Sequence, residues 1–90
     1  MTTHKVRVGT EYIFYPNFLD RHAGRTGLVP GTVVKVIQVH GCPPANTMGH
    51  AYVGNREDGH FIGLVHCNSL YAKKDAQIVI DALKRDAAVL

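Results

Sequence analysis

The sequence has no tryptophan, only two cysteines, and a charged fraction (Asp, Glu, Lys and Arg) of only 19% over its 90 residues. No apolar run reaches the ~18 residues that a membrane-spanning helix needs, because Lys35 and Gln38 interrupt the longest one. A hydrophobic fraction of 46% is typical of folded domains and argues against disorder. A chain of this length supports one hydrophobic core and not two. We therefore expect one small soluble domain that does not enter a membrane.

Two further features indicate a reducing compartment. Met1 to Lys5 lead into alternating residues and not into the apolar segment of an export signal. Cys42 and Cys67 are too few for a disulfide scaffold. We therefore predict a cytoplasmic protein with two reduced thiols, while a bond between the two cysteines stays an open alternative.

The pattern of apolar residues predicts a mainly β fold. Period-2 alternation or β-branched and aromatic runs mark extended segments at residues 5–8, 11–15, 32–40, 48–55 and 60–67. Asp58-Gly59 between the last two segments is typical of a hairpin turn. In the segment 32–40, Lys35 and Gln38 would point to opposite faces of a regular strand, so neither face is purely apolar or purely polar. We therefore expect that the strand contains a bulge or that other elements cover both of its faces. The sequence thus predicts a small half-open barrel of about five strands.

The last part of the chain, residues 72–90, has the spacing of an amphipathic helix. Its apolar stripe contains Ala76, Val79, Ile80, Leu83 and Ala87. Because an isolated helix of this length is marginal in water, the stripe needs a docking surface. We expect residues 1–71 to form the barrel and the helix to pack on it or on a second subunit, within one domain. In the second case, the stripe is the oligomer interface.

A mild positive charge suggests an alternative role. Ten Lys and Arg against seven Asp and Glu give a net charge of +3, concentrated in the first third of the chain. Basic residues there alternate with aromatic ones, a composition that small barrels use to bind single strands. The candidate nucleic-acid contacts are Arg7, Arg21, Arg25 and Lys35. The low net charge argues against high non-specific affinity.

The most distinctive stretch follows the third extended segment. Consecutive prolines after Cys42 stiffen the loop, so side chains displayed there lose little entropy on binding. The candidate partner or ligand contacts are Asn46, Thr47, His50, His66 and Asn68. For the two loop residues, Asn46 and Thr47, a structural role is an equal alternative to binding: their side chains would cap the backbone of their own loop.

Histidine and cysteine are present in numbers that raise the question of a metal or catalytic site. The chain has six histidines, but its two cysteines lack the Cys-x₂₋₄-Cys spacing of structural zinc sites. The neighbours His66 and Cys67 would point to opposite faces of a strand, so they do not chelate one ion together. No base can be singled out to activate either thiol. We therefore predict no metal, no cofactor and no catalytic residue.

The order of these features resembles the SH3-like small barrels. The resemblance rests on Val8-Gly9-Thr10, a long loop, residues 30–36, the Asp-Gly hairpin and Asn68-Ser69-Leu70. It implies a short 3₁₀ turn near the end of the barrel that carries Leu70 into the core. The stretch 41–50, with residues 61–65 and 68–70, also resembles small uncharacterised proteins of phages and other mobile elements. That likeness implies no activity.

These observations favour a small non-enzymatic binding module, an accessory protein of a mobile element that acts through protein contacts and self-association. A nucleic-acid-binding accessory protein is the first alternative. An oligomeric enzyme or ligand-binding protein with its site between subunits is the second. Type II dihydrofolate reductases are SH3-like barrels of this kind, but their Val-Gln-Ile-Tyr motif is absent here.

Overall fold

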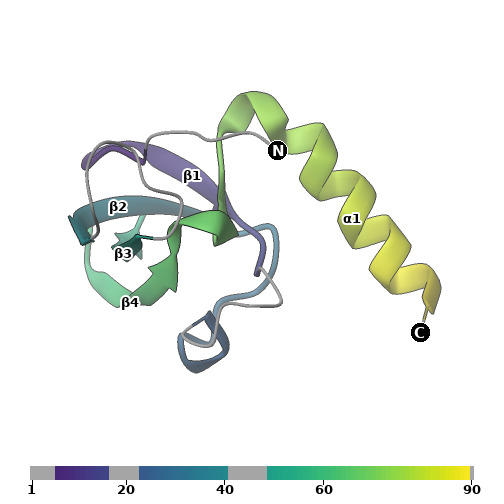
Figure 1. Cartoon of the computed structure of the whole chain (residues 1–90), viewed down its shortest axis with the longest axis horizontal. Helices are drawn as coiled ribbons and strands as arrows, with labels where there is room; N and C mark the ends of the chain where they lie inside the picture. Colours follow the sequence, from purple (N-terminus) through teal and green to yellow (C-terminus); the bar gives the residue numbers. More distant parts are fainter. Residues whose placement is uncertain (1–5, 17–22, 41–48, 90) are drawn as a thin grey trace.

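The computed structural model describes residues 6–16, 23–40 and 49–89. Five antiparallel strands form one open sheet in the order β4-β3-β2-β1-β5, followed by a C-terminal helix (Figure 1). The strands are β1 (Glu11–Phe14), β2 (Val33–His40), β3 (His50–Asn55), β4 (Phe61–His66) and β5 (Leu70–Tyr71), and the helix is α1 (Ala76–Val89). Three 3₁₀ turns join them: η1 (Ala23–Arg25), η2 (Cys67–Ser69) and η3 (Lys73–Asp75). The predicted fold class, a half-open mainly β unit with one C-terminal helix, is confirmed.

The prediction of a strand at residues 5–8 is wrong over residues 6–8, because residues 6 and 7 have no regular structure and Val8 and Gly9 form a turn. Gly9 adopts a φ of 85°, in the left-handed region, and its N–H donates to the carbonyl of Val36 at 2.8 Å. The turn leaves Val8 61% exposed, while Val6 before it packs against the core. The fifth strand is β5 instead, which pairs with β1 through Ile13–Tyr71 and Phe14–Leu70.

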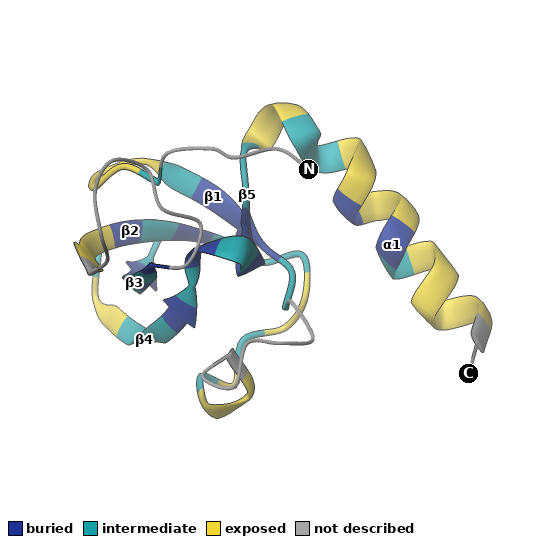
Figure 2. Cartoon of the chain, in the orientation of Figure 1, coloured by how far each residue is buried: buried dark blue, intermediate teal, exposed yellow. Residues whose placement is uncertain are grey.

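The core lies on the inner side of the curved sheet (Figure 2). Alternate residues of β2 and β3 point inward, and they meet the inner residues of β1, β4 and β5. The largest fully buried apolar side chains are those of Phe14, Leu70, Val34, Val36, Val53 and Val65. Leu70 directly follows η2 and is fully buried, as the resemblance implied.

A bulge in β2 accounts for the irregular spacing of its polar residues, Lys35 and Gln38. The register between β2 and β3 shifts between Val36 and Gln38, so Val36 pairs with Val53 while Gln38 pairs with Tyr52. The extra residue, Ile37, leaves the core side, and its Cδ1 lies over Gly54 on the outer face. Of the two alternatives that the sequence left open, a bulge or cover on both faces, the structure shows the bulge, and it sets which residues of β2 the outer face displays.

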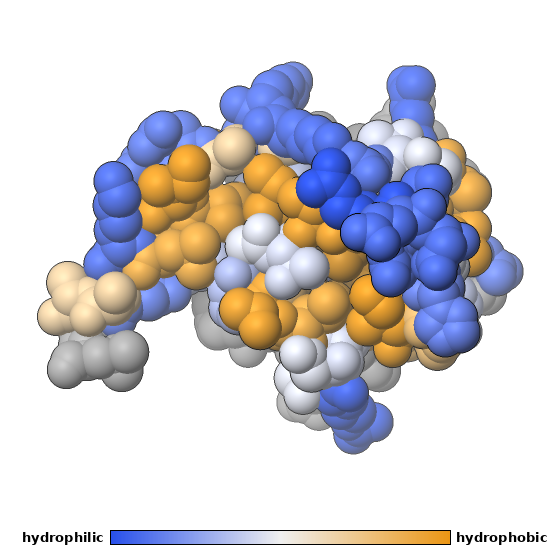
Figure 3. Space-filling view, turned by 180° about the vertical axis from the view of Figure 1, so that it is seen from behind, coloured by the Kyte–Doolittle hydropathy of each residue, from blue (hydrophilic) through white to orange (hydrophobic). Residues whose placement is uncertain are grey.

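Helix α1 packs against its own barrel. Val79 and Ala82 are buried, and the Leu83 side chain lies against Gly31. The Tyr15 hydroxyl donates to the Asp86 carboxylate, which raises the pKa of Tyr15 above its usual value. Apolar side chains line the side of the helix toward the barrel, while hydrophilic ones cover its outer side (Figure 3). No helix among the described residues is long and apolar enough to cross a bilayer.

Candidate functional site

The predicted ligand residues His50, His66 and Asn68 come together at one end of β3 and β4. His50 and His66 are partners in the register, and their rings are 5.1 Å apart in an edge-to-face arrangement. The backbone N–H of Asn68 donates to Nδ1 of His66 at 3.1 Å, so His66 caps the turn η2. Both rings are partly buried. Asn46 and Thr47 lie outside the described residues.

The predicted nucleic-acid contacts are distributed over different sides of the barrel. Arg7 is exposed in the turn before β1, and Lys35 is half-buried on β2 opposite Glu11. Arg25 belongs to η1, which packs against β4 on the far side from that turn (Figure 1). Arg21 lies outside the described residues. The three described candidates, Arg7, Arg25 and Lys35, therefore do not all lie on one side of the barrel.

The helix stripe expected to form an oligomer interface is divided between the inside and the surface of the chain. Val79 is buried against the barrel, Ala76 and Leu83 are half-buried, and Ile80 (41% exposed) and Ala87 lie at the surface. At 100° per residue, the docked face is rotated by roughly 60° from the centre of the apolar stripe. The docked face includes Ala82 and Asp86, which the apolar pattern did not single out. Ala82 is buried, and Asp86 accepts a hydrogen bond from Tyr15.

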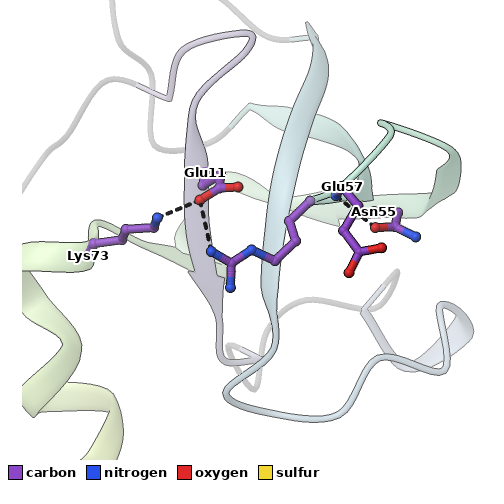
Figure 4. Close-up of polar contacts among 5 residues, drawn as sticks. Glu11, Asn55, Glu57 and Lys73 are labelled. Atoms are coloured by element: carbon purple, nitrogen blue, oxygen red, sulfur yellow. Dashed lines mark hydrogen bonds and ion pairs between the residues drawn. The ribbon is translucent and has the colours of Figure 1, made fainter.

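A charged cluster that sequence reasoning missed joins three elements on the surface (Figure 4). Glu11 on β1 accepts from the Lys73 ammonium of η3 and from Nη2 of Arg56, in the β3–β4 turn, at 3.5 Å. The Lys73 hydrogen bond is the main reason that the pKa of Glu11 lies below its ordinary value. These residues are far apart in sequence, so no local pattern reveals the cluster.

Replacing Glu11 by glutamine should lower the urea midpoint slightly at neutral pH, because Lys73 and Arg56 lose their carboxylate partner. A carboxyl whose pKa is depressed in the folded state stabilises the fold above its unfolded pKa, and this contribution is lost as pH falls through the folded value. The difference between E11Q and wild type should thus vanish in acid and shrink in high salt. Glu57→Gln is the control, since it removes the same charge and leaves both ion pairs in place. A Glu11 effect independent of pH would contradict the ion-pair explanation.

Of the two cysteines, the structure describes only Cys67. Cys67 is a buried thiol, and Cys42 lies outside the described residues. Among the side chains that the structure describes, no group of three His, Cys, Asp or Glu is placed to hold a metal ion.

Comparison with protein-family models, with curated proteins and with solved structures finds no match. The likenesses to SH3-like barrels and to phage-borne proteins therefore stay predictions. The function has to be argued from the surfaces of this chain.

Proposed function

We propose that the protein is a small non-enzymatic binding module that self-associates through the outer face of β2, β3 and β4. The surface concerned is the outer apolar patch, defined as Ile37, Tyr52, Phe61 and Leu64. A phage or mobile-element setting remains part of the proposal, on the likeness noted in the sequence.

The strand register supports this choice of surface. Ala51 and Val53 on β3 are fully buried, so the residue between them, Tyr52, belongs to the outer face. Leu64 is its partner on β4. Partners in an antiparallel pair project from the same face, which places these two side chains together outside the barrel.

Contacts extend the patch to its other two members. The rings of Tyr52 and Phe61 are 5.7 Å apart. Ile37 reaches over Gly54, and Gly54 is the partner of Phe61 in the register. Phe61 is 57% exposed, which is unusual for a large aromatic residue in a chain with few of them. A connected apolar surface of this kind marks an interaction site more often than scattered exposed residues do.

A second copy is the occupant that the sheet topology favours. The patch ends at β4, which is an edge strand of an open sheet. The sequence of β4, FIGLVH, contains no Lys, Asp, Glu or Pro, the residues with which proteins commonly block edge-to-edge association. Gly63 pairs with the core-facing Val53, so Thr26, which lies against Gly63, packs on the inner side of β4 and not over the outer apolar patch. Two copies related by a two-fold axis would bury their patches against each other.

The proposal is tested by sedimentation velocity over a wide range of protein concentration. We expect wild-type protein to sediment as a reversible dimer at high concentration. Phe61→Glu should sediment as a monomer throughout, because it places a charge at the centre of the buried surface. Ile78→Glu is the matched control, since Ile78 is exposed to nearly the same extent (55%) on α1, and this variant should dimerise like wild type.

Two results would contradict the proposal. One is a wild-type protein that stays monomeric at every concentration. The other is a dimer that Phe61→Glu leaves intact and Ile80→Glu dissociates, which would place the interface on the helix stripe. Nucleic-acid binding is less favoured, because Arg25 lies away from Arg7 and Lys35.

A further inference from the structure

We propose that the outer face of the sheet also binds single-stranded nucleic acid, with a base stacked on Phe61 and phosphates held by three cationic side chains beside it. These side chains are Lys35, Arg56 and Lys73. Only Lys35 belongs to the contacts that the sequence predicted, and Arg25 takes no part. The site shares Phe61 with the outer apolar patch, so nucleic acid and a second copy of the chain compete for it. Binding itself does not depend on self-association.

The strand register places a charged cluster and an exposed aromatic ring in one row across the outer face. Glu11 on β1 is the partner of Lys35 on β2, and Lys35 is the partner of Gly54 on β3. Gly54 in turn is the partner of Phe61 on β4. Both chain neighbours of Lys35 are fully buried in the core, so Lys35 projects from the outer face. The row therefore joins the ion pairs around Glu11 to the outer apolar patch.

Two further cations reach the same row. Arg56 follows β3, and its side chain extends past β2 to Glu11 on β1, with Nη2 3.5 Å from the carboxylate. Lys73 reaches the same carboxylate from η3. The side chains of Arg56 and Lys73 are 51% and 54% exposed, so a ligand has access to both. Together with Lys35, they give this part of the face more positive charge than the single carboxylate of Glu11 offsets.

The acidic residues of the β3–β4 turn are directed or engaged elsewhere. The side chain of Glu57 points away from Glu11 (Figure 4). Oδ1 of Asp58 accepts the backbone N–H of His60 within the turn. The positive charge is therefore concentrated on the part of the row that lies over β1 and β2, next to the exposed ring on β4.

An exposed ring beside cations fits a ligand that combines flat bases with phosphates. Phe61 is 57% exposed, and the ring of Tyr52 lies 5.7 Å from it, which restricts its movement before a base binds. Proteins bind single strands by stacking bases on such rings while basic side chains follow the phosphates. A guanidinium has five N–H donors, so Arg56 can hold a phosphate and keep its bond to Glu11. A duplex has to unstack a base first, so we expect single strands to be preferred.

The test is fluorescence anisotropy of a labelled oligothymidylate of about ten nucleotides with full-length protein, at about 50 and 200 mM salt. Three phosphate contacts predict a slope of about −2 for the logarithm of the binding constant against that of the salt concentration. Phe61→Ala should weaken binding about fivefold or more, because it removes the stacking platform. Arg56→Gln should make the slope shallower by about 0.7, the value for one lost phosphate contact.

Glu11→Gln gives a change of the opposite sign. Without the carboxylate, Lys73 and Arg56 turn to the phosphates and a repulsive charge is lost, so binding should tighten about twofold or more. Damage to the fold would weaken binding instead. Asp81→Asn is the matched control, since it makes the same charge change on α1 and should bind like wild type. Circular dichroism melts verify that each variant is folded before binding is compared.

Three results would overturn the inference. One is wild-type protein that does not bind the oligonucleotide at the lower salt concentration, and another is Phe61→Ala binding as tightly as wild type. The third is a polyglutamate peptide that competes as well as unlabelled oligonucleotide, which would indicate an acidic protein partner. Sedimentation velocity separates this inference from the proposed function. A monomer that binds the oligonucleotide contradicts self-association alone, and a dimer that ignores it contradicts nucleic-acid binding alone.

Discussion

Replacing Phe14 by alanine is expected to lower the free energy of unfolding by about 3–5 kcal/mol. Phe14 is only 1% exposed and is the largest of the fully buried side chains. It lies on β1 between β2 and β5, where it pairs with Leu70 and its N–H donates to the carbonyl of Thr32. Truncation removes a ring from the point where these strands meet and leaves a cavity that the short β5 cannot fill by moving inward.

The comparison for this variant is Phe61→Ala, measured in the same urea titration. Phe61 is the same residue type at 57% exposure, so its removal should change the free energy of unfolding by less than about 1 kcal/mol. Proteins have a total stability of about 5–15 kcal/mol, so Phe14→Ala should remove a large share of it. Similar losses for the two variants would contradict the placement of the core.

Gly54→Ala is expected to destabilise the protein by about 1–3 kcal/mol, the usual range for overpacking a tight site. A Cβ at position 54 would lie 2.6 Å from the Gly59 carbonyl oxygen and 2.8 Å from that of His60. Both atoms are backbone, so the β3–β4 hairpin has to shift, and the Ile37 Cδ1 at 2.6 Å has to move as well. The alanine therefore acts through crowding of the hairpin and not through an unfavourable φ.

Gly24→Ala is the matched control, since nothing lies within 4 Å of a Cβ at that position. A urea titration should show a loss for Gly54→Ala and almost none for Gly24→Ala. Because the shifted hairpin carries Phe61, Gly54→Ala should also weaken self-association. Two variants of equal stability would contradict the close approach of the hairpin to Gly54.

The sequence predicts the local features of the fold well. Asp58-Gly59 predicts the β3–β4 turn, and Gly59 indeed has a φ of 74°. The spacing of Lys35 and Gln38, which would point to opposite faces of a regular strand, predicts either a bulge or cover on both faces, and the structure has the bulge. The helical stripe predicts α1. Each of these signals comes from residues close together in the chain, where turn chemistry and periodicity decide the structure.

The features that sequence reasoning missed depend on tertiary placement. Residues 6–8 alternate like a strand, but the Gly9 turn leaves Val8 outside the sheet, and β5 completes the five strands instead. Helix α1 docks on a face rotated from its apolar stripe, where Ala82 is buried and Asp86 accepts a hydrogen bond from Tyr15. The sequence pattern within the helix gives no information on a hydrogen-bond partner as distant in the chain as Tyr15 is from Asp86.

In the candidate sites too, the sequence identifies single residues, but only the tertiary structure shows which of them are neighbours. Histidines 50 and 66 can be singled out from composition, but their alignment with each other depends on the β3–β4 register. The alignment of His40 with His50 depends in addition on the position of the β2 bulge. The outer apolar patch likewise needs the register, because Tyr52, Phe61 and Leu64 become neighbours only when β3 and β4 pair.

The central claim is that the outer apolar patch is the surface on which the protein self-associates. The most direct test is a dilution series followed by two-dimensional amide and methyl NMR of isotope-labelled wild-type protein. We predict that the resonances of Ile37, Tyr52, Phe61 and Leu64 shift with concentration while those of Ile78 and Ile80 on α1 stay in place. Concentration-dependent shifts confined to α1, or none at all, would contradict the account.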